Sequence, residues 1–180
     1  MEDSPWETDA LETIEATATN VYRWGHVGSA LLLYGPVGGL LRWGGEPGLA
    51  ALGAAIAVAC STLPDVDEHL HIEHRGPTHT IWFALAVGVG VAVIGVSLGA
   101  AFERPVATAA TTGVAAGLSL GSHVLADSIT PMGIRPLYPL SGWHHTFDIT
   151  PAESSRANAA LLALGVAVAL LCQVLVVTTL

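Results

Sequence analysis

The chain contains no lysine, and its charge is scarce and one-sided. All six basic residues are arginine, against 15 acidic residues, so the formal net charge is −9 over 180 residues. Proteins that bind nucleic acids need basic side chains to neutralise phosphates, so this composition argues against a nucleic-acid partner. The same acidic, lysine-free composition is halophile-like, and GC-rich codon usage is the alternative explanation.

Charged residues of both signs make up only 12% of the chain. That is about half the share found in soluble domains. Hydrophobic residues make up 52%, and the mean hydropathy is +0.58. A soluble domain of this size needs more polar residues to cover its surface, so the composition predicts a membrane protein forming one compact unit.

Cysteine pairs and a secretory leader are also missing. Cys60 and Cys172 lie in apolar runs without CxxC spacing, so we expect no disulfide and no metal binding from them. The first 20 residues carry six acidic and no basic residues, unlike a cleaved leader. We expect residues 1–21 to form a solvated acidic tail or a short surface helix.

The chain does contain several long segments without any charged residue. Three are long enough to cross a bilayer as helices, which takes about 20 residues: Thr80–Phe102, Pro105–Ala126 and Ala157–Leu180. Pro47–Pro64 is a fourth, shorter span. Val27–Leu41 is a fifth if the residues before it form its interfacial end, and a re-entrant or surface segment otherwise.

Five spans place the connecting segments alternately on two sides of the membrane. The N-terminal segment, Asp65–Pro77 and Ser128–Arg156 then share one side, called side one below. Tryptophans fall near the expected interfaces, with Trp24, Trp82 and Trp143 at side one and Trp43 at the other. We predict an all-α bundle of about five transmembrane helices, with residues 22–180 as a single membrane-embedded domain.

All eight histidines fall at side one or at the adjoining helix ends, although they are far apart in sequence. They are His26, His69, His71, His74, His79, His123, His144 and His145. Asp65 and Asp67 follow the second span directly, and Asp127 ends the fourth. Because the topology comes from hydropathy alone, this convergence is independent evidence for a polar site at one membrane face.

His123 and Asp127 stand four residues apart, so on a helix they point the same way. That spacing suits two ligands of one metal ion. Ionisable groups at the edge of a membrane span are costly and usually functional. The alternative is a local Asp–His hydrogen bond within the helix.

Two short motifs in the first side-one segment add further candidates. LPDVD (63–67) places Asp65 and Asp67 after a helix-ending proline, although such a pair alone usually marks a solvated turn. In HRGPTH (74–79), Gly-Pro makes a turn that brings His74 and His79 together. Arg75 lies between them, and its guanidinium suits a phosphate or carboxylate group, or an interfacial anchor. His69 and His71 are expected to be surface residues.

The candidate ligands together fit a metal centre. They are His26, Asp65, Asp67, His74, His79, His123 and Asp127. A catalytic zinc takes three protein ligands and a water, so seven candidates suit two ions. Mixed nitrogen and oxygen ligands favour Zn²⁺, with Mn²⁺ or Fe²⁺ as alternatives. No serine or cysteine nucleophile is recognisable, which leaves metal-activated water as the nucleophile.

The order of LPDVD (63–67), HRGPTH (74–79), SHVLADSITPMG (122–133) and RPLYP (135–139) resembles a family of small membrane-bound, metal-dependent hydrolases. Some of its members are LexA-regulated inner-membrane proteins. The resemblance runs from His26 to about Pro139 and implies that the same seven residues form the metal centre. Thr80 stands where the family usually has serine, and residues 68–73 are short for the family. The layout also looks like that of zinc-dependent phospholipases C, which implies phosphoester hydrolysis by analogy.

We therefore expect a hydrolase in which metal-activated water attacks a phosphoester or other ester of a small molecule or lipid. Asp65 or Asp67 is the expected general base, and Arg75 would stabilise developing negative charge. The alternative is a non-catalytic metal transporter or metal sensor. Against transport, Ser97, Thr108 and Ser119 alone offer a polar route to the other side. A structural scaffold would leave the histidine clustering unexplained.

The arginine distribution predicts the orientation of this multi-pass protein in the cell membrane. Four arginines flank the spans on side one (Arg23, Arg75, Arg135 and Arg156), and two lie on the other side (Arg42 and Arg104). Basic residues near span ends are enriched on the cytoplasmic side. Side one, with the metal site, is therefore expected to face the cytoplasm.

Overall fold

The computed structural model describes residues 5–70 and 72–179, and the side chains of residues 22–70 and 72–176. Its long helices are α1 (Pro5–Trp43), α2 (Pro47–Cys60), α4 (Ile81–Ala100), α5 (Pro105–Ser128) and α6 (Ser155–Thr179). Three short helices lie between α2 and α4: η1 (Leu63–Val66), α3 (Asp67–Leu70) and η2 (Pro77–His79). Strand pairing in the described part is limited to one bridge, between Ile134 and His145. The prediction of an all-α bundle is confirmed.

Each charge-free run of the sequence corresponds to one long helix, and local signals set the helix starts. The shortest run lies inside α1, and the ends of the other runs differ from those of their helices by up to four residues. Pro47 and Pro105 begin α2 and α5, where a missing backbone N–H costs nothing. The hydroxyl of Thr80 caps α4 by accepting a hydrogen bond from the Phe83 N–H at 3.2 Å. The N-terminal segment is helical from Pro5 and continuous with α1, whereas the side chains of its acidic residues lie outside those described.

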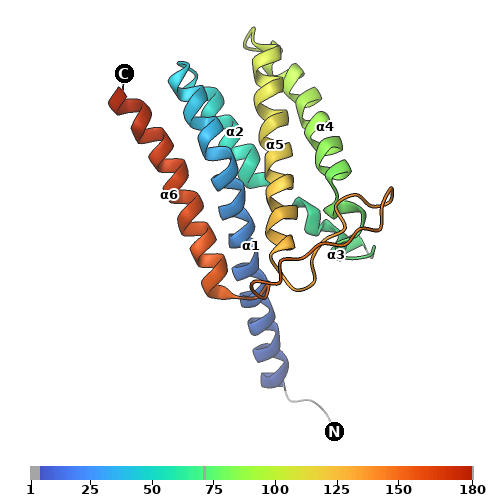
Figure 1. The fold of residues 1–180 in the computed structure, drawn as a ribbon. Coiled ribbons are helices and arrows are strands. Elements are labelled where there is room, and N and C mark those ends of the chain that lie inside the picture. Colours follow the sequence, from blue (N-terminus) through green and yellow to red (C-terminus); the bar gives the residue numbers. More distant parts are fainter. Residues whose placement is uncertain (1–4, 71, 180) are drawn as a thin grey trace.

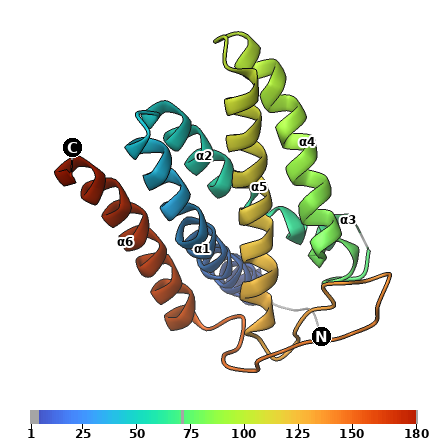
Figure 2. The same cartoon turned by 45° about the horizontal axis from the view of Figure 1, so that its top comes forward.

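Helix α5 lies at the centre of the bundle and contacts α1, α2 and α4, while α6 packs along α1 (Figures 1 and 2). The α1–α6 contact depends on glycine. A Cβ atom added to Gly165 would fall 2.0 Å from the carbonyl oxygen of Gly28, so only glycine allows the two backbones to approach this closely.

Large apolar side chains remain exposed on the outside of the bundle, as a lipid environment allows. Val93 and Ile94 of α4 are 63% and 68% exposed, and Leu170 of α6 is 60% exposed. Three described segments are long and apolar enough to cross a membrane: Pro47–Leu70, Ile81–Ala100 and Ser155–Val176. Helix α5 is more polar because its inward face carries buried hydroxyl, histidine and aspartate side chains.

The two ends of the bundle differ. The longer connections, residues 61–80 and 129–154, lie at the same end, below α4, α5 and α6 in Figure 1. We call this the site end. At the opposite end, Arg104 donates hydrogen bonds to both carboxylate oxygens of Glu46 and thereby joins the two tight turns. These bonds also lower the pKa of Glu46 from its ordinary value.

Candidate metal centre

Five of the predicted ligands meet at the site end, contributed by four separate elements. His26 comes from α1, Asp65 from η1, His79 from η2, and His123 and Asp127 from α5. Their side chains are buried, except that Asp65 is 14% exposed. Pro64 is the second residue of η1 and Pro77 the first of η2, and their fixed φ angles restrain the backbone that presents Asp65 and His79.

The centre of the cluster is a set of four atoms, one from each of four residues. The Nε2 atoms of His79 and His123 are 3.2 Å apart. From His79 Nε2, Oδ2 of Asp127 lies at 3.3 Å and Oδ1 of Asp65 at 3.5 Å. From His123 Nε2, the same two oxygens lie at 3.4 and 3.2 Å. Two ligands bound to one tetrahedral zinc are about 3.3–3.6 Å apart, so these distances suit a shared ion.

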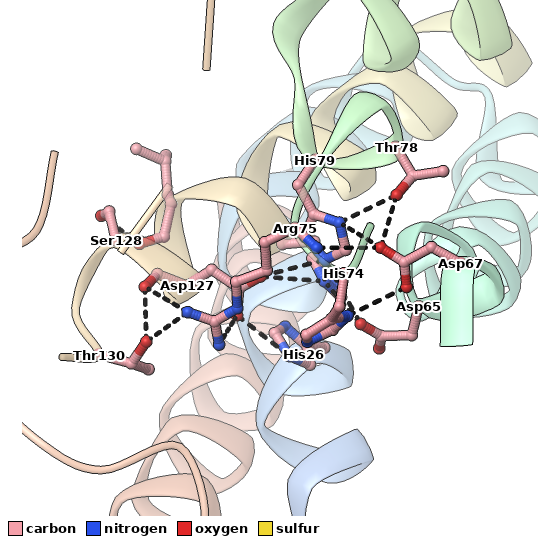
Figure 3. A network of polar contacts seen from close by, with 12 residues as sticks. His26, Asp65, Asp67, His74, Arg75, Thr78, His79, Asp127, Ser128 and Thr130 are labelled. Atoms are coloured by element: carbon pink, nitrogen blue, oxygen red, sulfur yellow. Dashed lines mark hydrogen bonds and ion pairs between the residues drawn. The ribbon is translucent and has the colours of Figure 1, made fainter. Parts of the chain in front are cut away.

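Outer hydrogen bonds determine which nitrogen each histidine turns toward the centre. Nδ1 of His123 donates to the carbonyl of Ser61 at 2.8 Å. Nδ1 of His79 lies 3.0 Å from the Thr78 hydroxyl and 3.2 Å from Oδ2 of Asp67, as Figure 3 shows. With both Nδ1 atoms used as donors, the two Nε2 lone pairs point at each other and at the carboxylate oxygens. A cation between them would relieve this repulsion, and outer acceptors of this kind are usual around metal-binding histidine.

Several polar atoms in the cluster are buried without a hydrogen-bond donor or acceptor. They are Nδ1 of His26, both carboxylate oxygens of Asp65 and Oδ2 of Asp127. A buried carboxylate oxygen that accepts no hydrogen bond is costly, even where the other oxygen is paired, as Oδ1 of Asp127 is with Arg75. A bound cation would interact with these buried lone pairs, so the residues present fit the predicted metal site.

His26 lies beside the four central atoms. Its ring stacks on that of His123 with centroids 3.7 Å apart, and its Nε2 lies 3.9 Å from Oδ1 of Asp127. His26, Asp65 and His123 each present one ligand atom within 4.8 Å of the others. His26 is therefore positioned as a further ligand of the same group.

Asp67 and His74 form a second group that shares His79 with the first. Oδ2 of Asp67 accepts hydrogen bonds from the Arg75 N–H at 3.1 Å and from the Thr78 hydroxyl at 2.9 Å, in addition to its contact with His79. Its Oδ1 lies 3.1 Å from Nδ1 of His74. Because both oxygens of Asp67 already face donors, its place is that of an outer carboxylate that orients His79 and His74.

Arg75 is buried and its guanidinium contacts groups of the protein. Its Nη2 lies 3.1 Å from Oδ1 of Asp127 and donates to the Tyr22 hydroxyl at 3.3 Å. Its Nη1 donates to the Thr130 hydroxyl at 2.6 Å and to the Gly133 carbonyl at 3.2 Å (Figure 3). The backbone φ of Arg75 is +58°, a left-handed conformation that non-glycine residues rarely adopt.

A pocket of about 650 Å³ opens beside the cluster. Asp65, His74 and Arg75 line it, so it reaches the groups that the sequence predicted to be catalytic apart from Asp67. His69 lines its outer part and is exposed, as expected for a surface residue. His71 lies outside the described residues. The volume is typical of small-molecule sites.

The two remaining described histidines, His144 and His145, make their contacts outside the cluster. Nε2 of His144 lies 2.8 Å from the Met132 carbonyl, and His145 stacks on Trp143. Both belong to the connection between α5 and α6.

Sequence reasoning missed Tyr22, whose hydroxyl donates to Oδ1 of Asp127 at 3.1 Å. Tyr22 lies one helical turn before His26 and on the same helix face, and this spacing could have indicated that it belongs to the site. It also missed the roles of Ser61 and Thr130, whose contacts cross between segments far apart in sequence. No local pattern marks either residue.

The fold and the cluster together define a class: a helical membrane protein with a buried histidine–aspartate group at one end of its bundle. The family model described as the YdjM inner membrane protein matches residues 22–179, so the chain belongs to that family. This match confirms the inner-membrane family and the membrane location. No curated protein and no solved structure matches the chain.

Proposed function

We propose that this protein is a membrane-bound, metal-dependent hydrolase of phosphoesters or other esters. The proposal rests on one observation: the Nε2 atoms of His79 and His123 lie 3.2 Å apart, and each lies 3.2–3.5 Å from one carboxylate oxygen of Asp65 and one of Asp127. Two nitrogens and two oxygens suit Zn²⁺, and Mn²⁺ or Fe²⁺ also accept this set. An ion held by all four residues would need a fifth position to bind the reacting water. When bound, such an ion lowers the pKa of water and polarises an ester oxygen.

We propose one ion in this centre, although the number of candidate ligands predicted two. A second ion would use Asp67, His74 and His79, which also lie within reach of one another. The single-ion proposal is supported by His79, whose Nδ1 is engaged by Asp67 when its Nε2 faces the first group. One imidazole nitrogen then serves the ion and the other serves the carboxylate.

Arg75 and Tyr22 have a positioning role in this proposal. Both contact Oδ1 of Asp127, which leaves Oδ2 turned toward the two histidines. The sequence suggested that Arg75 stabilises negative charge on the substrate. Its nearest partners are instead protein oxygens, which supports a role in holding Asp127 in place.

His74 is the proposed proton acceptor. Its Nδ1 lies against Oδ1 of Asp67, and its ring lines the pocket. A histidine that donates from Nδ1 to a carboxylate keeps the Nε2 lone pair free to accept a proton. The proton of the attacking water would pass to this Nε2 and then to the leaving alcohol.

Transport and sensing remain the competing functions, and the hydroxyl groups along α5 bear on transport. Ser119 donates to the Ala57 carbonyl at 2.6 Å and Thr112 to the Val91 carbonyl at 3.3 Å. Ser122 donates to the carbonyl of Ser119 at 2.7 Å. Hydroxyls bonded to backbone carbonyls serve helix packing, so they do not favour an ion path.

The proposal includes five spans and a cytoplasmic site end. The five long helices run along one another, and the excess of arginine at the site end supports this orientation.

Hydrolysis can be tested with the purified full chain in lipid nanodiscs. Zinc-loaded protein should hydrolyse bis(p-nitrophenyl) phosphate or p-nitrophenyl acetate, lose the activity after chelation and regain it with zinc. His144→Ala is a matched control, because His144 lies outside the cluster. A zinc-loaded protein that hydrolyses neither ester, or activity that survives complete chelation, would contradict the proposal.

A further inference from the structure

The lining of the pocket beside the cluster combines polar and apolar side chains. Tyr22, Asp65, His74 and Arg75 contribute polar groups. Ala59, Leu63, Val66, Met132 and Ala152 contribute apolar groups. A ligand that uses both kinds of contact is amphipathic, with its polar part next to Asp65 and the ligand cluster.

Part of the apolar lining of the pocket comes from the end of α2 and from η1, which follows it. Helix α2 has 14 residues. It is therefore only about 21 Å long, less than the roughly 30 Å of a hydrocarbon core. It ends at Cys60, while α1 and α5 continue past it at the site end (Figure 1). Val58 and Leu63, on either side of this end, are 39% and 37% exposed. The pocket lies at this end of α2, where Ala59 of α2 and Leu63 and Val66 of η1 line it.

The connection between α5 and α6 carries a second set of exposed apolar side chains at the same end. They are Met132, Leu140, Trp143, Phe147 and Ile149. Met132 also lines the pocket. Tryptophan and other large apolar side chains at such a position are typical of the membrane interface. The pocket mouth therefore lies at the level of lipid head groups.

The charged residues that line the pocket restrict which ligands can bind there. The pocket lining contains Asp65, Glu68 and Glu153 against Arg23 and Arg75, and Arg75 is bonded to Asp127. With a divalent ion bound, the charges of this lining roughly cancel, so it offers no excess positive charge to a ligand with several negative charges. A reacting group with at most one negative charge, such as a phosphodiester or a carboxylic ester, fits best.

We propose that the substrate is a membrane lipid. Its ester head group enters the pocket, and its hydrocarbon chains pass over Leu63 and Met132 into the bilayer. This inference rests on the proposed hydrolase function. Hydrolysis would break one ester bond, join the water oxygen to the phosphorus or acyl carbon, and deliver a proton to the leaving alcohol.

Photo-cross-linking tests the binding step separately from the chemistry. The full chain in nanodiscs would be labelled with phosphatidylglycerol that carries a diazirine on its acyl chain near the ester. Labelling should concentrate on the peptides containing Leu63 and Met132. Leu63→Gln and Met132→Gln should weaken it about tenfold, the effect of losing burial of roughly two methylene groups. Leu140→Gln is the matched control, since Leu140 is exposed on the same connection but does not line the pocket.

The same nanodiscs would be assayed for phosphatidylglycerol hydrolysis and, in parallel, for bis(p-nitrophenyl) phosphate hydrolysis. The proposal expects pocket labelling and lipid hydrolysis. Met132→Gln should slow lipid hydrolysis more than soluble-ester hydrolysis, and Leu140→Gln should change neither. Labelling spread evenly over α4 and α6 together with soluble ester hydrolysis would overturn the lipid substrate alone. Pocket labelling without hydrolysis of either ester would overturn the hydrolase function and leave a lipid-binding pocket.

Discussion

Replacing Asp67 with asparagine distinguishes an orienting carboxylate from a metal ligand, because the change removes the charge but keeps the shape. Oδ2 of Asp67 faces three donors, from Arg75, Thr78 and His79. Its Oδ1 faces only Nδ1 of His74. The amide oxygen of the asparagine is therefore expected to face the three donors, and its NH₂ group to face His74.

The expected effects differ for the two histidines. His79 keeps a weaker acceptor, so the affinity for zinc should fall by about 10–100-fold, which is usual for loss of an outer carboxylate. His74 must now accept at Nδ1, so its Nε2 carries the ring proton and no longer accepts one. The value of kcat should then fall by about 10²–10⁴-fold, the contribution of general acid–base catalysis.

Equilibrium dialysis with elemental analysis would give zinc affinity and number, and kcat would be measured with bis(p-nitrophenyl) phosphate at saturating zinc. Glu73→Gln is the matched control, because Glu73 lies in the same connection and pairs with exposed Arg135. Fewer zinc ions at saturation in Asp67→Asn than in the wild type would make Asp67 a ligand and refute the outer role. An unchanged kcat would refute the role of His74.

Three further predictions concern the cluster and the topology. His79→Ala should remove the bound zinc, whereas His69→Ala should keep it; elemental analysis showing the reverse would contradict the ligand set. Arg75→Ala leaves Asp127 buried without its cationic partner and should lower the free energy of unfolding by about 3–5 kcal/mol, measured by denaturation in detergent; unchanged stability would contradict the positioning role. Alkaline phosphatase fused after Leu180 should be active outside the cell, and cytoplasmic fluorescence from a fluorescent protein at that position would contradict five spans with a cytoplasmic site end.

The helices could be predicted from the sequence because a bilayer demands long charge-free runs. Pro47 and Pro105 even gave the first residues of α2 and α5. The sequence also predicted that His26, His79 and His123 converge, because the order of the membrane spans places all three at the same end of the bundle. For residues 1–21 the sequence left open a solvated tail or a short surface helix, because an acidic segment suits either. It did not predict that a helix runs from Pro5 into the first span.

The division of the cluster into inner and outer residues could not be predicted. Asp65 and Asp67 look equivalent in LPDVD, but η1 turns Asp65 toward His123 and leaves Asp67 beside Thr78 and His79. That difference arises from short-helix geometry and from contacts between segments, neither of which has a sequence period. For the same reason the seven candidates suggested two ions, whereas the contacts of His79 support one.

The zinc content of the purified full chain tests the central claim most directly. After dialysis against chelator-free buffer containing zinc, elemental analysis should find one zinc ion per wild-type chain, and none in His123→Ala that remains folded. Two ions per chain would contradict the single-ion centre. A folded wild-type chain without zinc, manganese or iron would contradict the metal centre itself.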